Sequence, residues 1–280
     1  MTFSILQAVY KNDNPSFLNE CFKSIYDNTV KPSLIVLVKD GVLPEVLENA
    51  INKWEKNLPL KVVGYEHNQG LAHALNYGLK FIDTELVARM DSDDICFPNR
   101  FERQVAFFEN NPSSEIVGTG ISEFYIDKTG AELKKTRLYP EITNRDSKTL
   151  FKGTPLGHPT VMIKTTLLKE FGYSEATNMC EDIDLWFRLI KTGHTIQNLQ
   201  EPLLNFRITE GTFKRRSISK ALSEFSIYWK NLVSLFNFSP LLIYPIARLF
   251  VRFLPYWMNK KLYFSKARTS MFSENKTQVR

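Results

Sequence analysis

The chain has 280 residues, a length that fits one large domain or two ordinary ones and allows a sizeable core. Its hydrophobic content of 43% and charged content of 24% are close to globular averages, which excludes wholesale disorder. Three cysteines lie far apart with no CxxC pair, so a disulfide scaffold or a structural zinc site is not expected and a reducing compartment is. The first residues lack the basic start and long apolar run of a secretory signal, so we expect a cytoplasmic protein.

The net charge of +6 is unevenly distributed along the chain. Residues 205–280 carry 14 Lys and Arg but only 3 Asp and Glu, whereas the first 204 residues carry 22 and 27. A mildly acidic body with a basic tail indicates a tail that meets an anionic surface. Nucleic acid and membrane lipid are both candidates for that surface.

Strands and helices alternate through the first ninety residues. Short apolar runs predict strands at residues 3–10, 34–39, 60–66 and 85–90. Apolar residues at helical spacing predict helices that begin at Asn14-Pro15 and that cover residues 47–54 and 71–82. This order predicts an α/β fold with a parallel sheet, in which ligands bind beyond the carboxyl ends of the strands. Asp40 and the cluster Asp91–Asp94 both fall at such ends.

The pattern changes after residue 112. We expect a hairpin over 116–133 with its turn near 128–130, and a strand at 158–163. Further along, the sequence predicts a helix over 183–190 that ends near Gly193, two short strands at 195–199 and 203–208, and a long helix over 217–238.

Asp91, Asp93 and Asp94 form the sharpest local motif. Three carboxylates within four residues repel one another, and such crowding persists more easily when a cation neutralises it. Hard cations such as Mg²⁺ or Mn²⁺ prefer oxygen ligands of this kind. The alternative is a solvated acidic turn in which Asp94 caps the next helix.

For the other candidate residues, a purely structural role is a strong alternative to a functional one. Glu181 and Asp182 precede a helix, where carboxylates are favoured by capping and by the helix dipole. His158 could be a ligand or a base, but a lone histidine is more often a structural residue with a hydrogen-bond partner. The loop Asn68–Leu71 fits a phosphate contact or a plain turn, and the cluster Lys214–Arg216 fits a diphosphate clamp, a lipid contact or a solvated charge run.

The order of these motifs resembles the inverting nucleotide-sugar glycosyltransferases of family two, which have the GT-A fold. The motifs are Tyr10 after the first strand, Asp40-Gly41 after the second, Asn68-Gln69-Gly70-Leu71, Met90-Asp91-Ser92-Asp93-Asp94, Gly157-His158-Pro159, Glu181-Asp182 with Trp186, and Arg207. The resemblance covers residues 3–216, so we expect a catalytic domain at 1–216 and a helical, membrane-associating region at 217–280. Within the family, the chain is most similar to bacterial enzymes that build O-antigen or capsule repeat units.

The resemblance implies roles for the donor half of the site. Tyr10 and Asp40 would hold the uridine, although many members have two aspartates where this chain has Lys39 and Asp40. Asp91 would face the ribose and the donor sugar. Asp93, with Asp94 beside it, would bind the Mn²⁺ or Mg²⁺ that bridges the diphosphate.

The resemblance also implies the rest of the site. Asp182 would be the general base, with Glu181 as its catalytic neighbour, since a sugar hydroxyl needs a proton acceptor when it attacks. Arg207, Arg215 and Arg216 match the segment that closes over the diphosphate. The expected reaction moves a hexose from a UDP-sugar to a polyprenyl-diphosphate-linked saccharide, giving a β linkage to GlcNAc.

The basic tail contains the aromatic and aliphatic stretch 239–257. Prolines and arginines interrupt it, so a spanning helix is not expected. On a helical wheel, Ile246, Leu249, Phe250, Phe253 and Trp257 share one face, whereas Arg248, Arg252 and Asn259 lie opposite. This pattern favours an interfacial helix on an anionic membrane, aided by Lys260, Lys261, Lys266 and Arg268. The alternative is a helix packed on the catalytic domain.

We therefore expect a peripheral enzyme at the cytoplasmic face of the inner membrane, with no nucleic-acid partner. A nucleotidyltransferase remains an alternative, although the sequence lacks a glycine-rich, lysine-bearing triphosphate loop near its N-terminus. A non-catalytic nucleic-acid-binding protein is the other alternative, based on the basic tail. No motif identifies the donor sugar or the carbon that is joined.

Overall fold

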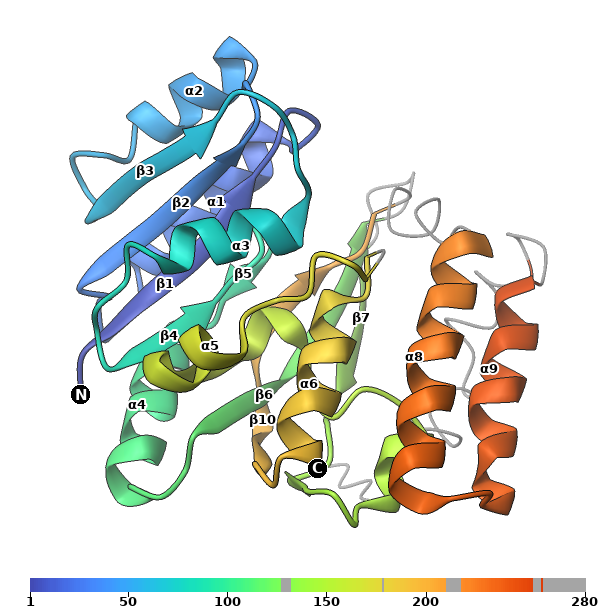
Figure 1. Cartoon of the computed structure of the whole chain (residues 1–280). Coiled ribbons are helices and arrows are strands. Elements are labelled where there is room, and N and C mark those ends of the chain that lie inside the picture. The colour runs from blue at the N-terminus through green and yellow to red at the C-terminus, as the bar shows by residue number, and fades with distance from the viewer. Residues whose placement is uncertain (127–131, 178, 210–217, 254–257, 259–280) are drawn as a thin grey trace.

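The computed structural model describes residues 1–126, 132–177, 179–209, 218–253 and 258. Figure 1 shows helices lying on both sides of a twisted sheet. The strands are β1 (Phe3–Val9), β2 (Leu34–Asp40), β3 (Leu60–Tyr65), β4 (Leu86–Arg89), β5 (Ile95–Cys96), β6 (Ile116–Ile126), β7 (Glu132–Arg137), β8 (Ile142–Thr143), β9 (Met162–Lys164) and β10 (Ile196–Arg207). The helices are α1 (Pro15–Tyr26), α2 (Glu45–Asn52), α3 (Leu71–Leu79), α4 (Arg100–Asn110), α5 (Thr165–Phe171), α6 (Glu181–Lys191), α8 (Ile218–Phe236) and α9 (Ile243–Phe253).

The strands of the described residues form one mixed sheet. Its order is β3-β2-β1-β4-β9-β6-β10-β5, with β7 paired to β6 and β8 paired to β10. Strands β1 to β4 are mutually parallel, and β6 and β10 form another parallel pair. β9 runs antiparallel to β4 and β6 and so joins the two parallel groups. The predicted α/β class, with a mixed, mainly parallel sheet flanked by helices, is confirmed.

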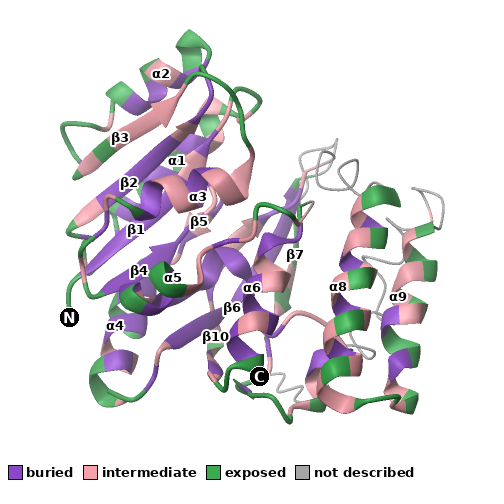
Figure 2. Cartoon of the chain, viewed as in Figure 1, coloured by how far each residue is buried: buried purple, intermediate pink, exposed green. Residues whose placement is uncertain are grey.

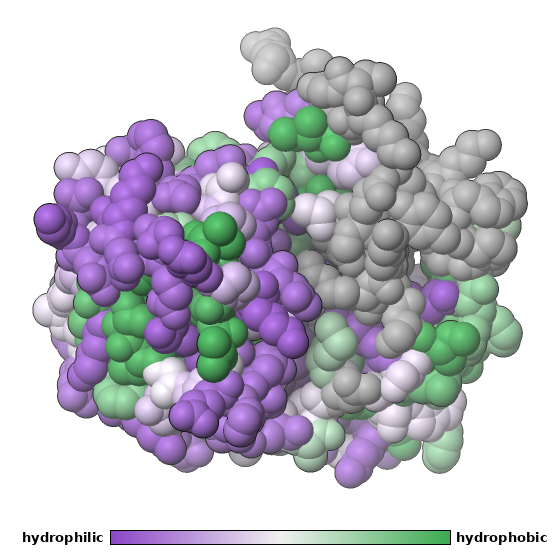
Figure 3. Space-filling model, turned by 90° about the horizontal axis from the view of Figure 1, so that it is seen from above, coloured by the Kyte–Doolittle hydropathy of each residue, from purple (hydrophilic) through white to green (hydrophobic). Residues whose placement is uncertain are grey.

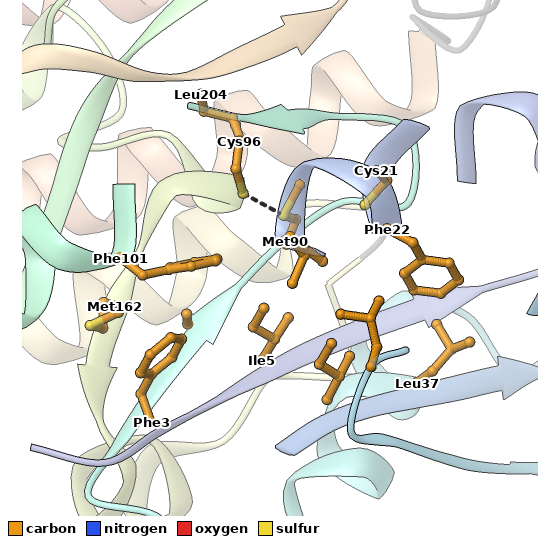
Figure 4. Close-up of a cluster of buried hydrophobic side chains, with 14 of the residues drawn as sticks. Phe3, Ile5, Cys21, Phe22, Leu37, Met90, Cys96, Phe101, Met162 and Leu204 are labelled. Atoms are coloured by element: carbon orange, nitrogen blue, oxygen red, sulfur yellow. Dashed lines mark hydrogen bonds between the residues drawn. The ribbon is translucent and has the colours of Figure 1, made fainter. Parts of the chain in front are cut away.

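Each face of the sheet has its own hydrophobic core, because neighbouring residues of a strand point to opposite sides. In β1, Ile5 packs in the cluster that includes side chains of α1, α2 and α4, whereas Leu6 packs in the cluster that includes α3, α5 and α6. Figure 4 shows the first cluster, in which the Cys96 thiol donates to the Met90 sulfur at 3.0 Å. Figure 2 shows that the buried residues follow the strands through the middle of the molecule.

Helix α1 begins where the sequence predicts. The Asn14 side-chain oxygen accepts hydrogen bonds from the backbone N–H groups of Ser16 (2.8 Å) and Phe17 (3.3 Å), and Pro15 takes the first helical position. A cap of this kind typically contributes about 1 kcal/mol to stability. The loop between β1 and α1, which includes Tyr10, is therefore held at the carboxyl edge of the sheet.

The predicted strand at 158–163 is wrong over its first half. His158–Thr160 form a 3-10 turn, in which the Thr160 hydroxyl donates to the Gly157 carbonyl at 2.7 Å, and β9 begins at Met162. The physical reason is Pro159, which has no N–H to donate to a strand ladder.

The two short strands predicted at 195–199 and 203–208 are one strand, β10. Its register against β6 shifts on either side of Pro202, so the proline sits at an irregularity of a continuous strand. Helix α4 is absent from the sequence prediction because its buried face includes Arg100 and Gln104, which hide the apolar period. Helix α5 is also absent from that prediction, and at 7 residues it is too short for a clear period.

The long helix predicted at 217–238 is α8, and α9 lies beside it (Figure 1). Tyr228 of α8 packs edge-on against Phe187 of α6, with 5.3 Å between ring centroids. Across the described residues, no helix combines the length and apolarity that a bilayer crossing needs. The predicted boundary after residue 216 and several predicted contact residues lie outside the described residues, namely Lys214, Arg215, Arg216, Trp257, Asn259, Lys260, Lys261, Lys266 and Arg268.

The contact between α3 and the sheet depends on a glycine and gives a first prediction. A Cβ at Gly78 would lie 2.5 Å from Val38 Cγ2 and 2.7 Å from Leu6 Cδ1. We expect Gly78→Ala to lower the free energy of unfolding by about 1–3 kcal/mol in urea denaturation, despite the higher helix propensity of Ala. Gly153→Ala is the control, since its Cβ would meet no atom closer than 4.0 Å. Equal unfolding midpoints for the two variants would contradict the tight packing of α3.

Candidate active site

The residues Asp91–Asp94, here called the acidic turn, follow β4 at the carboxyl edge of the sheet. One oxygen each from Asp91, Asp93 and Asp94 lies within 4.8 Å of the others. Burial raises the pKa of Asp94 well above its ordinary value, and the charges of Asp91 and Asp93 add to this. Asp94 does not cap the next helix, because α4 begins at Arg100 with Asn99 as its N-cap residue. The capping interpretation of Asp94 is therefore wrong.

Donors from three separate elements fix the backbone of the acidic turn. Gln7 of β1 donates to the Asp91 carbonyl at 3.1 Å, and the Cys21 thiol of α1 donates to the same oxygen at 3.4 Å. Arg207, at the end of β10, donates from Nε to the Asp93 carbonyl (2.8 Å) and from its backbone N–H to Asp94 Oδ1 (2.9 Å). The sheet therefore holds the turn in one conformation.

Arg89 is a buried counter-charge that the sequence analysis missed. It is the last residue of β4, and its guanidinium forms a salt bridge with Asp91. Arg100 donates to the Arg89 carbonyl at 2.9 Å and so braces the end of the strand. The signal for Arg89 was a charged residue in an otherwise apolar strand, directly before the aspartates.

The acidic turn has the donor set that a hard divalent cation needs. Asp91 forms a salt bridge with Arg89, and one oxygen each of Asp93 and Asp94 lies in the same cluster, in agreement with their predicted role as ligands. Among the described residues, Asp94 Oδ2 is buried without a hydrogen-bond partner. A buried, unpartnered carboxylate oxygen is strongly disfavoured, and a bound cation removes that penalty. These residues therefore fit the predicted Mn²⁺ or Mg²⁺ site.

Glu181 and Asp182 occupy the first turn of α6, as predicted. Burial, and then the neighbouring charge of Glu181, raises the pKa of Asp182 to about 6. A carboxylate that serves mainly as a helix cap is stabilised in its charged form, which lowers the pKa. The net effect at Asp182 has the opposite sign, and it favours a proton acceptor that titrates near neutrality.

The hydroxyl of Tyr173 is affected by the charges of both this carboxylate pair and Asp91 of the acidic turn. Burial raises the pKa of Tyr173, and although Arg89 opposes this, the charges of Asp182, Glu181 and Asp91 add to it. The three carboxylates therefore lie within electrostatic reach of one hydroxyl. Figure 1 shows the N-terminus of α6 on the same side of the molecule as the carboxyl ends of β1 and β2.

His158 has the contacts of a structural residue. Its Nε2 lies 3.0 Å from the Tyr173 hydroxyl, and its ring packs edge-on against Trp186. Burial, with the charge of Arg89 adding to it, lowers the pKa of His158 well below its ordinary value. The imidazole is therefore neutral at pH 7 and supports Tyr173.

Asp40 organises the loop that follows β3. Its carboxylate accepts hydrogen bonds from the Tyr65 hydroxyl (2.9 Å), the Asn68 amide (2.7 Å) and the backbone N–H groups of Gln69 (2.7 Å) and Gly70 (3.1 Å). The side chain is buried by these partners. Its described contacts are those of a loop anchor, and a direct contact with uridine stays a prediction.

Tyr10 lies close to the acidic turn through Asp13. The Asp13 carboxylate accepts from the Tyr10 backbone N–H (3.2 Å) and from the Ser92 hydroxyl (3.0 Å). The first-strand loop and the acidic turn therefore share one anchor. The nucleotide-binding role of Tyr10 stays a prediction.

Arg207 is more deeply engaged than the sequence analysis expects. Its guanidinium lies 4.0 Å from the ring centroid of Phe17 and 4.7 Å from that of Phe124, and it forms a salt bridge with Glu20. The residue is buried. These contacts describe a residue that positions Asp93 and Asp94, while its predicted contact with the diphosphate stays a prediction.

The Asp40 network gives a second prediction. We expect Asp40→Ala to lower the free energy of unfolding by about 2–4 kcal/mol, because several half-buried donors lose their acceptor together. Asp83→Ala is the control, since the Asp83 side chain is almost fully exposed and surface ion pairs contribute little. Chemical denaturation of both variants measures the difference. Equal stability would show that Asp40 does not anchor the loop.

Comparisons with known proteins agree with this geometry. Residues 4–172 match the family described as Glycosyl transferase family 2. A UDP-Gal:alpha-D-GlcNAc-diphosphoundecaprenol beta-1,3-galactosyltransferase from Escherichia coli is 34% identical over 260 residues, which cover 90% of this chain and 92% of that protein. The amylovoran biosynthesis glycosyltransferase AmsE from Erwinia amylovora is 35% identical over 81% of this chain and 84% of its own length.

A solved structure shows the same fold. The crystal structure of S. aureus TarS 1-349 in complex with UDP-GlcNAc superposes with a TM-score of 0.68 at 17% identity, covering 97% of this chain and 78% of that one. This likeness supports the predicted GT-A architecture. The chain belongs to glycosyl transferase family 2, and it is a glycosyltransferase.

Proposed function

We propose that this enzyme moves a hexose from a UDP-sugar to a saccharide carried on a polyprenyl diphosphate, in the assembly of an O-antigen repeat unit. The observation that carries the proposal is that three carboxylates gather in the acidic turn at the carboxyl edge of the sheet, while the charges of Asp91, Glu181 and Asp182 all act on the hydroxyl of Tyr173. The Escherichia coli relative is named for transfer from UDP-Gal to GlcNAc-diphosphoundecaprenol, and its similarity extends along nearly the whole chain. This supports a lipid-linked acceptor and a β linkage to GlcNAc.

The acidic turn would form the donor half of the site. Asp93 and Asp94 would hold Mn²⁺ or Mg²⁺, which supplies positive charge to the departing diphosphate. Asp91 would orient the ribose and the donor sugar, and the salt bridge with Arg89 fixes its position. Tyr10 and Asp40 would border the uridine, while Arg207 with the undescribed Arg215 and Arg216 would complete the cationic side.

Asp182 would serve the acceptor half as general base. Its carboxylate takes the proton of the acceptor hydroxyl while that oxygen forms a bond to C1 of the sugar. The bond between C1 and the diphosphate oxygen breaks, and UDP leaves with the bonding electrons. Attack opposite the leaving group inverts C1, so an α-linked donor gives a β-linked product. Glu181 would act indirectly, because its charge helps to raise the pKa of the base.

The third prediction tests Asp182 as the base. Asn has the shape of Asp but cannot accept the proton, and Asp182 lies in the first turn of α6 rather than at its N-cap residue, Cys180. We therefore expect Asp182→Asn to keep the wild-type melting temperature and UDP-sugar affinity but to lose at least about a hundredfold in kcat. Asp184→Asn is the matched control on the same turn. Its carboxylate accepts from Arg188 Nε at 2.7 Å, so this variant should lose stability rather than turnover.

The same base predicts a pH profile. With a raised pKa of about 6, Asp182 is protonated and inactive below that pH and ionised above it. The wild-type kcat/KM should therefore rise as the pH increases to about 6 and then level off, and this step should be absent from the residual activity of Asp182→Asn. Near-wild-type turnover by Asp182→Asn would return the residue to the capping interpretation.

The fourth prediction concerns the metal. Asp93→Ala should reduce transfer by at least about a thousandfold, because the diphosphate loses several kcal/mol of charge stabilisation. Titration with Mn²⁺, followed by the electron paramagnetic resonance of the free ion, should show weakened binding in Asp93→Ala but not in Asp83→Ala. EDTA should stop wild-type transfer, and added Mn²⁺ or Mg²⁺ should restore it. Full activity in excess chelator would refute the metal assignment.

A lipid-linked acceptor places the reaction at a membrane surface. We propose peripheral attachment at the cytoplasmic face of the inner membrane, with an anionic lipid surface as the partner. The support is the sequence: no Asp or Glu occurs between Phe225 and Ser273, where several Lys and Arg do.

A further inference from the structure

Helix α9 packs on the protein through Arg248 and Arg252. From the sequence, this cationic face of the helix is expected to contact lipid headgroups instead. Arg252 donates to Glu224 Oε2 of α8 at 2.7 Å, and Arg248 lies 3.6 Å from the same carboxylate. Arg248 also donates to the Phe151 carbonyl at 3.1 Å, and its guanidinium lies 4.4 Å from the ring centroid of Tyr228. Glu224 is buried. The two arginines therefore attach α9 to the body of the enzyme.

Phe250 and Phe253 of the opposite, apolar face of α9 are exposed, whereas Ile246 and Leu249 of that face are half-buried. The exposed fractions are 60% for Ile243, 68% for Phe250 and 50% for Phe253. Phe238, in the connection between α8 and α9, is 83% exposed. Figure 3 shows hydrophobic surface at the end of the molecule that α8 and α9 form. We call Phe238, Ile243, Phe250 and Phe253 the α9 face.

A surface of this kind marks a binding site, because isolated soluble proteins rarely expose clustered large apolar residues. The sequence that follows α9 indicates the kind of partner that this surface binds. Residues 254–280 carry Lys260, Lys261, Lys266, Arg268, Lys276 and Arg280 against one acidic residue, Glu274. An apolar helix face that is followed in the sequence by a strongly cationic segment is complementary to a bilayer with anionic headgroups.

We propose that the α9 face inserts into an anionic phospholipid bilayer, with Glu224 holding Arg248 and Arg252 away from the lipid. The proposal rests on the proposed function, since a polyprenyl diphosphate acceptor lies in that bilayer. It differs from an ordinary interfacial helix in one respect. The helix's own arginines bind the protein, and the headgroup contacts come from the basic segment that follows.

Vesicle binding by the full chain tests the proposal. The probes are vesicles of phosphatidylglycerol and phosphatidylethanolamine, with phosphatidylcholine vesicles as the neutral comparison. We expect wild type to sediment with the anionic vesicles, and Phe250→Ser/Phe253→Ser to lose at least about tenfold in partition coefficient. Ile243→Ser should give a smaller loss. The control Val42→Ser/Val46→Ser replaces two residues that are as exposed but lie near α2, and it should bind as wild type.

Two further measurements separate the possible outcomes. Transfer to a short-chain, water-soluble GlcNAc diphosphate should be unchanged in Phe250→Ser/Phe253→Ser, so a loss of membrane binding is distinguishable from a loss of the proposed activity. Light scattering gives the oligomeric state. The proposal is overturned if Phe250→Ser/Phe253→Ser binds the anionic vesicles like wild type. It is also overturned if wild type is a dimer that these substitutions convert to a monomer, because the α9 face would then join two copies.

Discussion

Charge repulsion at the carboxyl end of β4 is the constraint on which the site depends. Three carboxylates lie within 4.8 Å, and one of them, Asp94, is buried. Two contacts reduce this repulsion. The Arg89 guanidinium forms a salt bridge with Asp91, and the backbone N–H of Arg207 donates to Asp94 Oδ1. The Arg207 guanidinium forms a salt bridge with Glu20. Because Asp94 Oδ2 is buried without a hydrogen-bond partner among the described residues, the turn favours a bound cation.

Asp182, the proposed base, and Asp91 of the acidic turn both act electrostatically on Tyr173. β9 runs antiparallel between β4 and β6 and joins the two parallel groups, and α5 and then α6 follow it along the chain. Tyr173 and His158 fill the space between the two groups and hydrogen-bond to each other. The pKa of Asp182 is raised by its burial and then by the charge of Glu181. The position of Asp182 is set by the first turn of α6.

The sequence allowed the fold and the location of the acidic turn to be predicted, because these depend on local signals. Asn14-Pro15 starts α1, and the aspartates follow an apolar strand at the edge where ligands bind. The features that the sequence did not allow to be predicted depend on contacts between residues that are distant along the chain. Arg89 and Gln7 support the acidic turn through partners that no spacing rule connects, and the embedding of Arg207 between Phe17 and Phe124 joins α1, β6 and β10. The orientation of α9 likewise depends on Glu224, a residue of another helix.

The central claim is that the acidic turn binds a divalent cation opposite the carboxylate of Asp182, with the donor sugar between them. A crystal of the enzyme with UDP and Mn²⁺, measured at the manganese absorption edge, tests this most directly. The account predicts one anomalous peak bonded to carboxylate oxygens of the acidic turn and to the diphosphate, with Asp182 across the space where the sugar's C1 would lie. A manganese peak elsewhere, or a diphosphate bound away from Asp93 and Asp94, would contradict it.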